Sequence, residues 1–258
     1  MRSLLEAGGR KLPFLRWSAV RMALGARHLL REWQAGDGRE EALAGYVLAH
    51  SRPGDLDGAI GAVDDFCYRK SIMMNVGDEK GEILDAAIVR AQPSRLLELG
   101  AYCGYSALRT TRAMPPGGHL WSIERNAANA DIARRIWEHA GVADRVTVAV
   151  GAIGDGGRTL DRLASEHGFG EGGVDFVFID HDKAAYLPDL ERLLARGWLH
   201  RGSVVVADNV RFPGAPKYRA YMQAEEGKTW RTTGHRAHLE YQTLVKDLVL
   251  ESEYLGQP

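Results

Sequence analysis

The fold of this chain is decided by the stretch Leu96-Leu97-Glu98-Leu99-Gly100-Ala101-Tyr102-Cys103-Gly104-Tyr105-Ser106. It reads as a short apolar strand, a turn with two glycines and the first turn of a helix. Gly100 and Gly104 allow the backbone to bend and allow a ligand to approach the main chain closely. The helix that follows directs free N–H groups and the positive end of its dipole at this turn. In a parallel sheet such a turn commonly binds a nucleotide-like ligand.

The chemistry of the turn argues against a pyrophosphate ligand. Its glycines are spaced G-x-x-x-G instead of G-x-G-x-x-G, and Glu98 lies in the strand just before them. A carboxylate at this place attracts a cationic or ammonium-bearing ligand and repels a phosphate. An ordinary connection from strand to helix, with no ligand, is the alternative that the turn alone leaves open.

The whole composition is that of a globular protein. The chain has 258 residues, of which 45% are apolar and 26% charged, enough for one α/β domain with an appendage or at most two small domains. A net charge of −1 gives no electrostatic footprint for nucleic acid. Cys67 and Cys103 form no disulfide framework and no metal-ligand spacing, which favours a reducing, cytoplasmic compartment.

The N-terminal part is predicted to be a helical extension, residues 1–37, ahead of an α/β domain at 38–258. Apolar side chains between Leu15 and Trp33 recur at helical spacing, with arginines mostly off that stripe. Polar residues interrupt any secretory core, and no run of ~20 apolar residues spans a bilayer. A basic amphipathic helix of this kind lies on an anionic membrane surface or packs on this protein or a second copy.

Strands and helices alternate after three predicted helices at 39–51, 56–69 and 78–92, the last capped by Asp78 and ended by Pro93. The predicted strands are Arg95–Leu99, Leu120–Glu124, Val146–Val150, Asp175–Asp180 and Ser203–Asp208. The predicted helices between them are Tyr105–Met114, Asn126–Ala140, Gly156–His167 and Tyr186–Arg196. This alternation indicates a parallel sheet with helices on both faces. Two closing runs, 229–233 and 241–250, predict an antiparallel pair at one edge.

Polar side chains stand at the carboxyl ends of these strands, where open parallel sheets bind ligands. Glu124 comes 20 residues after Gly104 and is placed to accept hydrogen bonds from a ribose, a reading that does not separate a dinucleotide from another adenosine ligand. Asp180, Asp208 and Asn209 offer two carboxylates and an amide oxygen on one rim, a set that suits Mg²⁺.

Two further polar residues have an ordinary reading and a functional one. Lys183 follows Asp180 by three residues, and a cation beside it would favour its neutral form, which accepts a proton from a hydroxyl. A solvated lysine at a helix start is the bland alternative. Glu240, ahead of the last strand, reads as a surface acid when taken alone.

Several longer motifs occur in a fixed order along the chain. They are Met74–Gly81, Leu97–Ser106, Asp180-His181 with Lys183, Ala207–Val210 with Pro213–Pro216, and Leu239–Tyr241. From about Glu40 onward, this set resembles the catechol O-methyltransferase family. The resemblance implies the Rossmann-like class I methyltransferase fold, with a mostly parallel seven-stranded sheet whose last strand is antiparallel. It also implies Mg²⁺-dependent transfer of a methyl group from S-adenosylmethionine to one hydroxyl of a catechol, which leaves S-adenosylhomocysteine.

The resemblance carries roles onto individual residues. It implies cofactor contacts for Val76, Glu98, Gly100, Tyr102 and Ser106 along the methionine part, for Glu124 at the ribose, and for Asp180. The implied Mg²⁺ ligands are Asp180, Asp208 and Asn209. Lys183 becomes the general base, and the implied substrate contacts are Lys183, Asn209 and Glu240, the last bonding the second catechol hydroxyl.

The chain departs from the family at the predicted ring slot. Ile72 and Asp182 stand where the members known best have tryptophans, so we expect a more open and more polar slot. A flavonoid or caffeoyl compound with two vicinal hydroxyls is therefore the alternative substrate. Ile153 replaces a serine on the adenine side. A non-catalytic adenosyl-binding module, the alternative from another class, would keep Glu98 and Glu124 and lose the metal set or Lys183.

Overall fold

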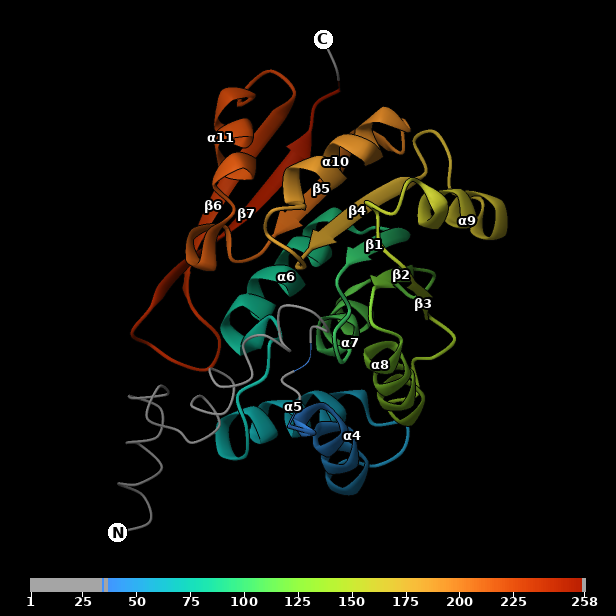
Figure 1. The fold of residues 1–258 in the computed structure, drawn as a ribbon, viewed down its shortest axis with the longest axis vertical. Helices are drawn as coiled ribbons and strands as arrows, with labels where there is room; N and C mark the ends of the chain where they lie inside the picture. Colours follow the sequence, from blue (N-terminus) through green and yellow to red (C-terminus); the bar gives the residue numbers. More distant parts are fainter. Residues whose placement is uncertain (1–33, 35–36, 257–258) are drawn as a thin grey trace.

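A seven-stranded sheet forms the centre of the computed structural model, which describes residue 34 and residues 37–256 (Figure 1). Its strands are β1 Arg95–Leu99, β2 His119–Glu124, β3 Val146–Val150, β4 Val174–Ile179, β5 Leu199–Ala207, β6 Trp230–His238 and β7 Lys246–Tyr254. Their spatial order is β3-β2-β1-β4-β5-β7-β6. β7 runs antiparallel to both neighbours, and the remaining pairs are parallel, as the sequence predicts.

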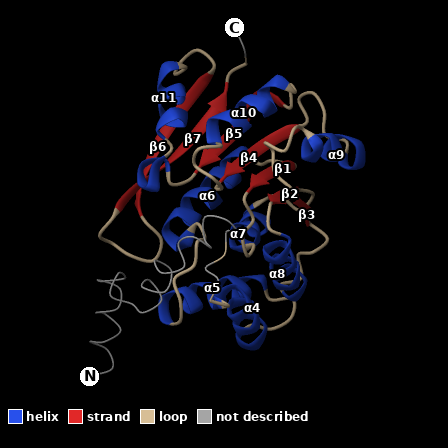
Figure 2. Cartoon of the chain, viewed as in Figure 1, coloured by secondary structure: helices blue, strands red, loops and turns tan. Residues whose placement is uncertain are grey.

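Helices cover both faces of this sheet (Figure 2). Side chains of α6 Gly77–Ala91, α7 Tyr105–Ala113 and α8 Ala127–His139 pack into one core. Those of α9 Arg158–His167, α10 Tyr186–Ala195 and α11 Pro216–Ala224 pack into the other. The two leading helices, α4 Arg39–His50 and α5 Leu56–Arg69, form an outer layer against α8 and α7 respectively.

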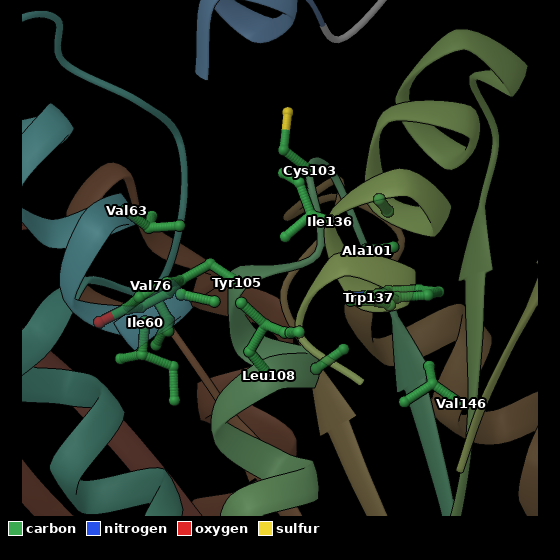
Figure 3. Packing of buried hydrophobic residues seen from close by; sticks show 14 of the residues in the cluster. Ile60, Val63, Val76, Ala101, Cys103, Tyr105, Leu108, Ile136, Trp137 and Val146 are labelled. Carbon is green, nitrogen blue, oxygen red and sulfur yellow. The ribbon is translucent and has the colours of Figure 1, made fainter. Parts of the chain in front are cut away.

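Successive residues of the central strands enter opposite cores, which explains why these strands are apolar runs instead of alternating ones. Leu96 and Phe176 join the core with α6, α7 and α8, whereas Leu97 and Val177 join the core with α9, α10 and α11. Figure 3 shows part of the first core, where Trp137, Ile136 and Leu108 belong to the same cluster as Val76 and Tyr105.

Several predicted boundaries are wrong by a few residues. α6 begins at Gly77 without a side-chain cap, because Asp78 instead lies in its first turn and accepts a hydrogen bond from Tyr68. β5 begins at Leu199, and the closing strands lie later than predicted, since 239–245 forms the turn between them. The turn η2 Val210–Gly214 and helix α11 were not predicted.

The helix predicted between Leu15 and Trp33 lies outside the described residues. In the part of the chain that the structure describes, no helix combines the length and apolar character that a membrane crossing requires. The carboxyl ends of β1, β2, β4 and β5 meet at one edge of the sheet because these strands are parallel and adjacent.

Candidate active site

The turn between β1 and α7 has the tight geometry that its glycines predict. Gly100 has φ +104, and a Cβ there would lie 2.3 Å from the carbonyl oxygen of Asp180. Gly104 has φ +85, and a Cβ there would lie 2.4 Å from the indole nitrogen of Trp137. Tyr102, between them, is also left-handed with φ 47. Side chains are therefore excluded at both glycines, because the turn packs directly against Asp180 and Trp137.

Glu98 is a fully buried carboxyl beneath this turn. Its two oxygens accept hydrogen bonds from the hydroxyls of Ser106, at 2.5 Å, and Ser122. Burial raises the pKa of Glu98 to about 7, although the two hydroxyls act against that rise. Predicted cofactor residues Glu98 and Ser106 are thus in direct contact, and the site holds an acid whose negative charge a cationic ligand would stabilise.

Glu124 connects the ends of β1 and β2. One of its oxygens accepts the N–H of Tyr102 at 2.9 Å, and the other accepts the N–H of Asn126 at 2.7 Å. Burial raises the pKa of Glu124, and the hydrogen bonds to Asn126 and Tyr102 lower it in part. The predicted ribose acceptor therefore lies against the glycine turn. Val76, at the start of α6, is buried in the same cluster as Tyr105 (Figure 3).

The predicted metal and base residues also come together. Ile179 is in register with Ala207, so Asp180 and Asp208 leave β4 and β5 side by side. The ammonium of Lys183 donates to Asp180 at 2.9 Å and to the Tyr186 hydroxyl at 2.5 Å. Tyr186 in turn donates to the carbonyl oxygen of Asp208 at 3.0 Å. Tyr186 thus ties Lys183 to both strand ends.

A buried cation that the sequence analysis did not single out lies beside these residues. The Lys80 ammonium, on α6, is 2.7 Å from Asp208 Oδ2 and 3.3 Å from Asp247 Oδ2, and it also contacts Glu240. Burial alone would lower the pKa of Lys80. The negative charges of Asp208, Glu240 and other nearby acids together raise this pKa by more than burial lowers it, so Lys80 is charged. Lys80 lies inside the quoted Met74–Gly81 motif, a signal that could have drawn attention to it, whereas Asp247 is one of several charged residues of β7 and has no such signal.

The donor set fits a divalent cation by two observations. Asp208 Oδ2 is buried and accepts no hydrogen bond from the described residues, although Lys80 approaches it as an ion pair. Burial raises the pKa of Asp208, and the nearby Asp180 adds to this rise. Four carboxylates and two ammonium groups meet here and leave two formal negative charges uncompensated, from Asp180, Asp208, Glu240, Asp247, Lys80 and Lys183.

No group of three or more His, Cys, Asp or Glu side chains that could hold a metal ion occurs in the described residues. The predicted set is of another kind, since its third member is the amide of Asn209. Asn209 is 6% exposed and its amide nitrogen donates to Glu240 at 3.0 Å. Glu240 is therefore not a free surface acid but part of this cluster.

A cavity of about 160 Å³ opens next to this cluster, between the start of α6 and the loop that joins β6 to β7. It is lined by Val76, Lys80, Glu240 and Tyr241, among others. Of the two residues at the family's tryptophan positions, Asp182 is exposed and accepts the N–H of Ala184 at 3.0 Å, which caps the turn before α10. Ile72 is partly exposed, and Ile153 is buried in the core with α9 and α10.

Comparison with known proteins gives the family. A model described as O-methyltransferase matches residues 62–231. The chain belongs to the O-methyltransferase family. This O-methyltransferase is 62% identical over 235 residues to a probable O-methyltransferase of Mycobacterium tuberculosis, a match that covers 91% of this chain and 100% of the relative. It is 39% identical over 213 residues to catechol O-methyltransferase of Mus musculus, which covers 83% and 78% of the two chains.

Solved structures share the fold of this O-methyltransferase at lower identity. The O-methyltransferase TomG from Streptomyces achromogenes, solved in complex with SAM, has a TM-score of 0.62 and 24% identity, over 76% of this chain and 89% of that one. An O-methyltransferase from Bacillus cereus, in complex with SAH, has a TM-score of 0.60 and 24% identity, over 83% and 97%. Both support the seven-stranded methyltransferase fold.

Proposed function

We propose that this O-methyltransferase transfers a methyl group from S-adenosylmethionine to one hydroxyl of a catechol, with Mg²⁺ bound by Asp180, Asp208 and Asn209. The observation that carries the proposal is the meeting of these oxygens with Lys183 and Glu240 at adjacent strand ends. Relatives named catechol O-methyltransferase, such as the mouse protein at 39% identity, support the same substrate class.

The proposed binding of S-adenosylmethionine depends on the attraction between its positive charge and the Glu98 carboxylate. S-adenosylmethionine is a sulfonium cation that also bears an amino acid, and the buried Glu98 beneath the β1–α7 turn suits such a ligand. Glu124, held by two main-chain N–H groups, would accept the ribose hydroxyls. The turn would then hold the cofactor at the carboxyl end of β1, next to the β1/β4 pair where the strand order reverses and open parallel sheets bind their ligands.

On the substrate side of the site, each polar residue has a proposed role in the transfer of the methyl group. When bound, Mg²⁺ lowers the pKa of the two chelated catechol hydroxyls and fixes their position. As the neutral amine, the form that a divalent cation beside it would favour, Lys183 would take the proton of the attacking hydroxyl on its Nζ, and Asp180 and Tyr186 would hold that Nζ in place. Glu240 accepts the hydrogen bond of the second hydroxyl. Alignment of the attacking oxygen with the methyl group supplies the rest, a contribution that can reach ~7–11 kcal/mol.

The deciding assay measures transfer of labelled methyl from S-adenosylmethionine to a panel of simple catechols, caffeoyl compounds, flavonoids and monohydroxylated phenols, with and without EDTA. We expect turnover that EDTA abolishes and added Mg²⁺ restores. Turnover that is unchanged in EDTA would overturn the metal assignment, and transfer confined to monohydroxylated phenols would overturn the catechol assignment. Preference for the larger compounds would agree with the exposed Asp182 at the slot.

A further inference from the structure

The carboxylate of Asp247 holds two parts of the candidate site together. Asp247 lies on β7 and is 1% exposed. Its Oδ2 accepts the amide N–H of Asn209 at 2.7 Å, and its Oδ1 accepts the main-chain N–H of Phe212 at 3.0 Å. Both oxygens are therefore engaged, one by a predicted metal ligand and one by the η2 turn that follows it.

The chemistry of these contacts fixes which way the Asn209 amide faces. Carboxylates only accept hydrogen bonds, so the NH₂ end of the amide must face Asp247 and Glu240. A flipped amide would place its oxygen against two negatively charged groups, which is unfavourable. The carbonyl oxygen of Asn209 consequently points away from both acids.

Lys80 keeps this arrangement in place. Its ammonium, 1% exposed, lies between Asp208, Asp247 and Glu240, three carboxylates that would otherwise repel one another. Asp247 therefore stays close to Asn209 as a charged acceptor even though it has no contact with bulk water.

We propose that Asp247 is a positioning residue: it orients the Asn209 amide so that the carbonyl oxygen faces the cation, without itself touching metal or substrate. The inference rests on the proposed function, because it requires Asn209 to be a metal ligand. Groups that orient a ligand from behind typically change metal affinity by about 10–100-fold when they are altered.

The substitution Asp247→Asn tests this with almost no change in volume. An amide at position 247 can offer its single oxygen either to the NH₂ of Asn209 or to the main-chain N–H of Phe212, so one of the two contacts is lost. In either orientation the negative charge that holds the Asn209 NH₂ is gone, and with the NH₂ of residue 247 turned to Asn209 the Asn209 amide is free to flip. Mn²⁺ binding, followed by electron paramagnetic resonance on the full chain, is expected to weaken at least about 10-fold, with competition by Mg²⁺ weakened in parallel.

A paired swap separates orientation from a general loss of structure. In the double variant Asn209→Asp with Asp247→Asn, the donor and the acceptor exchange places, and the new amide can still accept from Phe212. We expect the swap to bind Mn²⁺ more tightly than the product of the two single effects predicts. Asp175→Asn is the matched control, because Asp175 likewise accepts main-chain N–H groups, at 2.9 Å and 2.8 Å, but at the opposite end of the sheet.

The outcomes are distinct. If the parent protein binds no Mn²⁺, the proposed metal dependence fails and this inference fails with it. If the parent binds and Asp247→Asn binds equally well, the inference alone is overturned. If Asp247→Asn weakens binding but the swap shows no coupling, the role of Asp247 is general support of the fold and the inference is again overturned; circular dichroism identifies any variant that is unfolded.

Discussion

At the scale of one residue, burial of the Glu98 carboxyl couples its ionisation to the binding of a cationic ligand. Its carboxyl has no contact with water and is held by two serine hydroxyls, and burial raises its pKa from the usual 4.5 to about 7. The neutral form therefore dominates in mildly acidic solution when no ligand is bound. A ligand with a positive charge favours the ionised form, so binding and deprotonation of this group are linked.

The pH dependence of stability follows from this shift. Because the folded-state pKa lies above the unfolded value, the contribution of Glu98 is fully present below about pH 4.5 and is lost as pH rises through about 7. Relative to Glu98→Gln, the ligand-free parent should therefore lose about 3 kcal/mol of unfolding free energy between pH 4.5 and 8. Urea unfolding of both proteins across this range measures the difference. Curves that stay parallel would show that Glu98 does not carry this dependence.

Lys183 is the second residue whose role is testable alone. Lys183→Ala removes the Nζ that Asp180 and Tyr186 hold, and general-base catalysis is worth about 10²–10⁴-fold in rate. We expect turnover to fall by that factor while the affinity for S-adenosylmethionine stays the same. Lys228→Ala, which changes an exposed lysine in the turn that follows α11, is the control. Retained turnover in Lys183→Ala would remove the base assignment.

At the scale of an element, the β1–α7 turn packs so closely against its neighbours that Gly100 and Gly104 leave no room for a Cβ atom. Gly100→Ala would place a methyl group against the Asp180 carbonyl at a positive φ, so we expect a loss of at least about 2 kcal/mol of stability and of cofactor binding. Gly61→Ala, inside α5 with open space at its Cβ, should instead stabilise by about 0.5–1 kcal/mol. Thermal unfolding compares the two. A Gly100→Ala protein as stable as the parent would contradict the close approach of Asp180.

The same scale shows what the sequence could predict. β1 and β3 have the predicted ends, because their buried apolar runs are bounded by turn residues. The last strand was placed too early because the loop at 239–245 contains Tyr241, Leu244 and Val245, apolar residues that read as the start of a strand. The sequence predicted the site residues Asp180, Asp208, Asn209 and Lys183 because each closely follows an apolar run that can be recognised as a strand. Lys80 and Asp247 were missed because they are distant in sequence, 167 residues apart, and only the packing of α6 on β7 brings them together.

At the scale of the molecule, the outer helical layer is tied to the cofactor turn. The Tyr102 hydroxyl donates to Glu40 on α4 at 2.8 Å, and the Tyr105 hydroxyl donates to Asp64 on α5 at 2.6 Å. A ligand that orders this turn should also order both helices. We expect S-adenosylhomocysteine to slow amide hydrogen exchange in α4 and α5, with little change in the edge strand β6. Unchanged exchange in both helices would mean that the outer layer is energetically independent of the turn.

The position of β7 has a consequence for how the protein is made. β7 lies between β5 and β6, although both of these strands precede it along the chain. During synthesis on the ribosome β5 therefore waits with an unpaired flank, and β6 has no sheet to join, until the final strand is translated. Asp247 lies in that strand, so the acid cluster of a nascent chain stays incomplete until β7 has been translated.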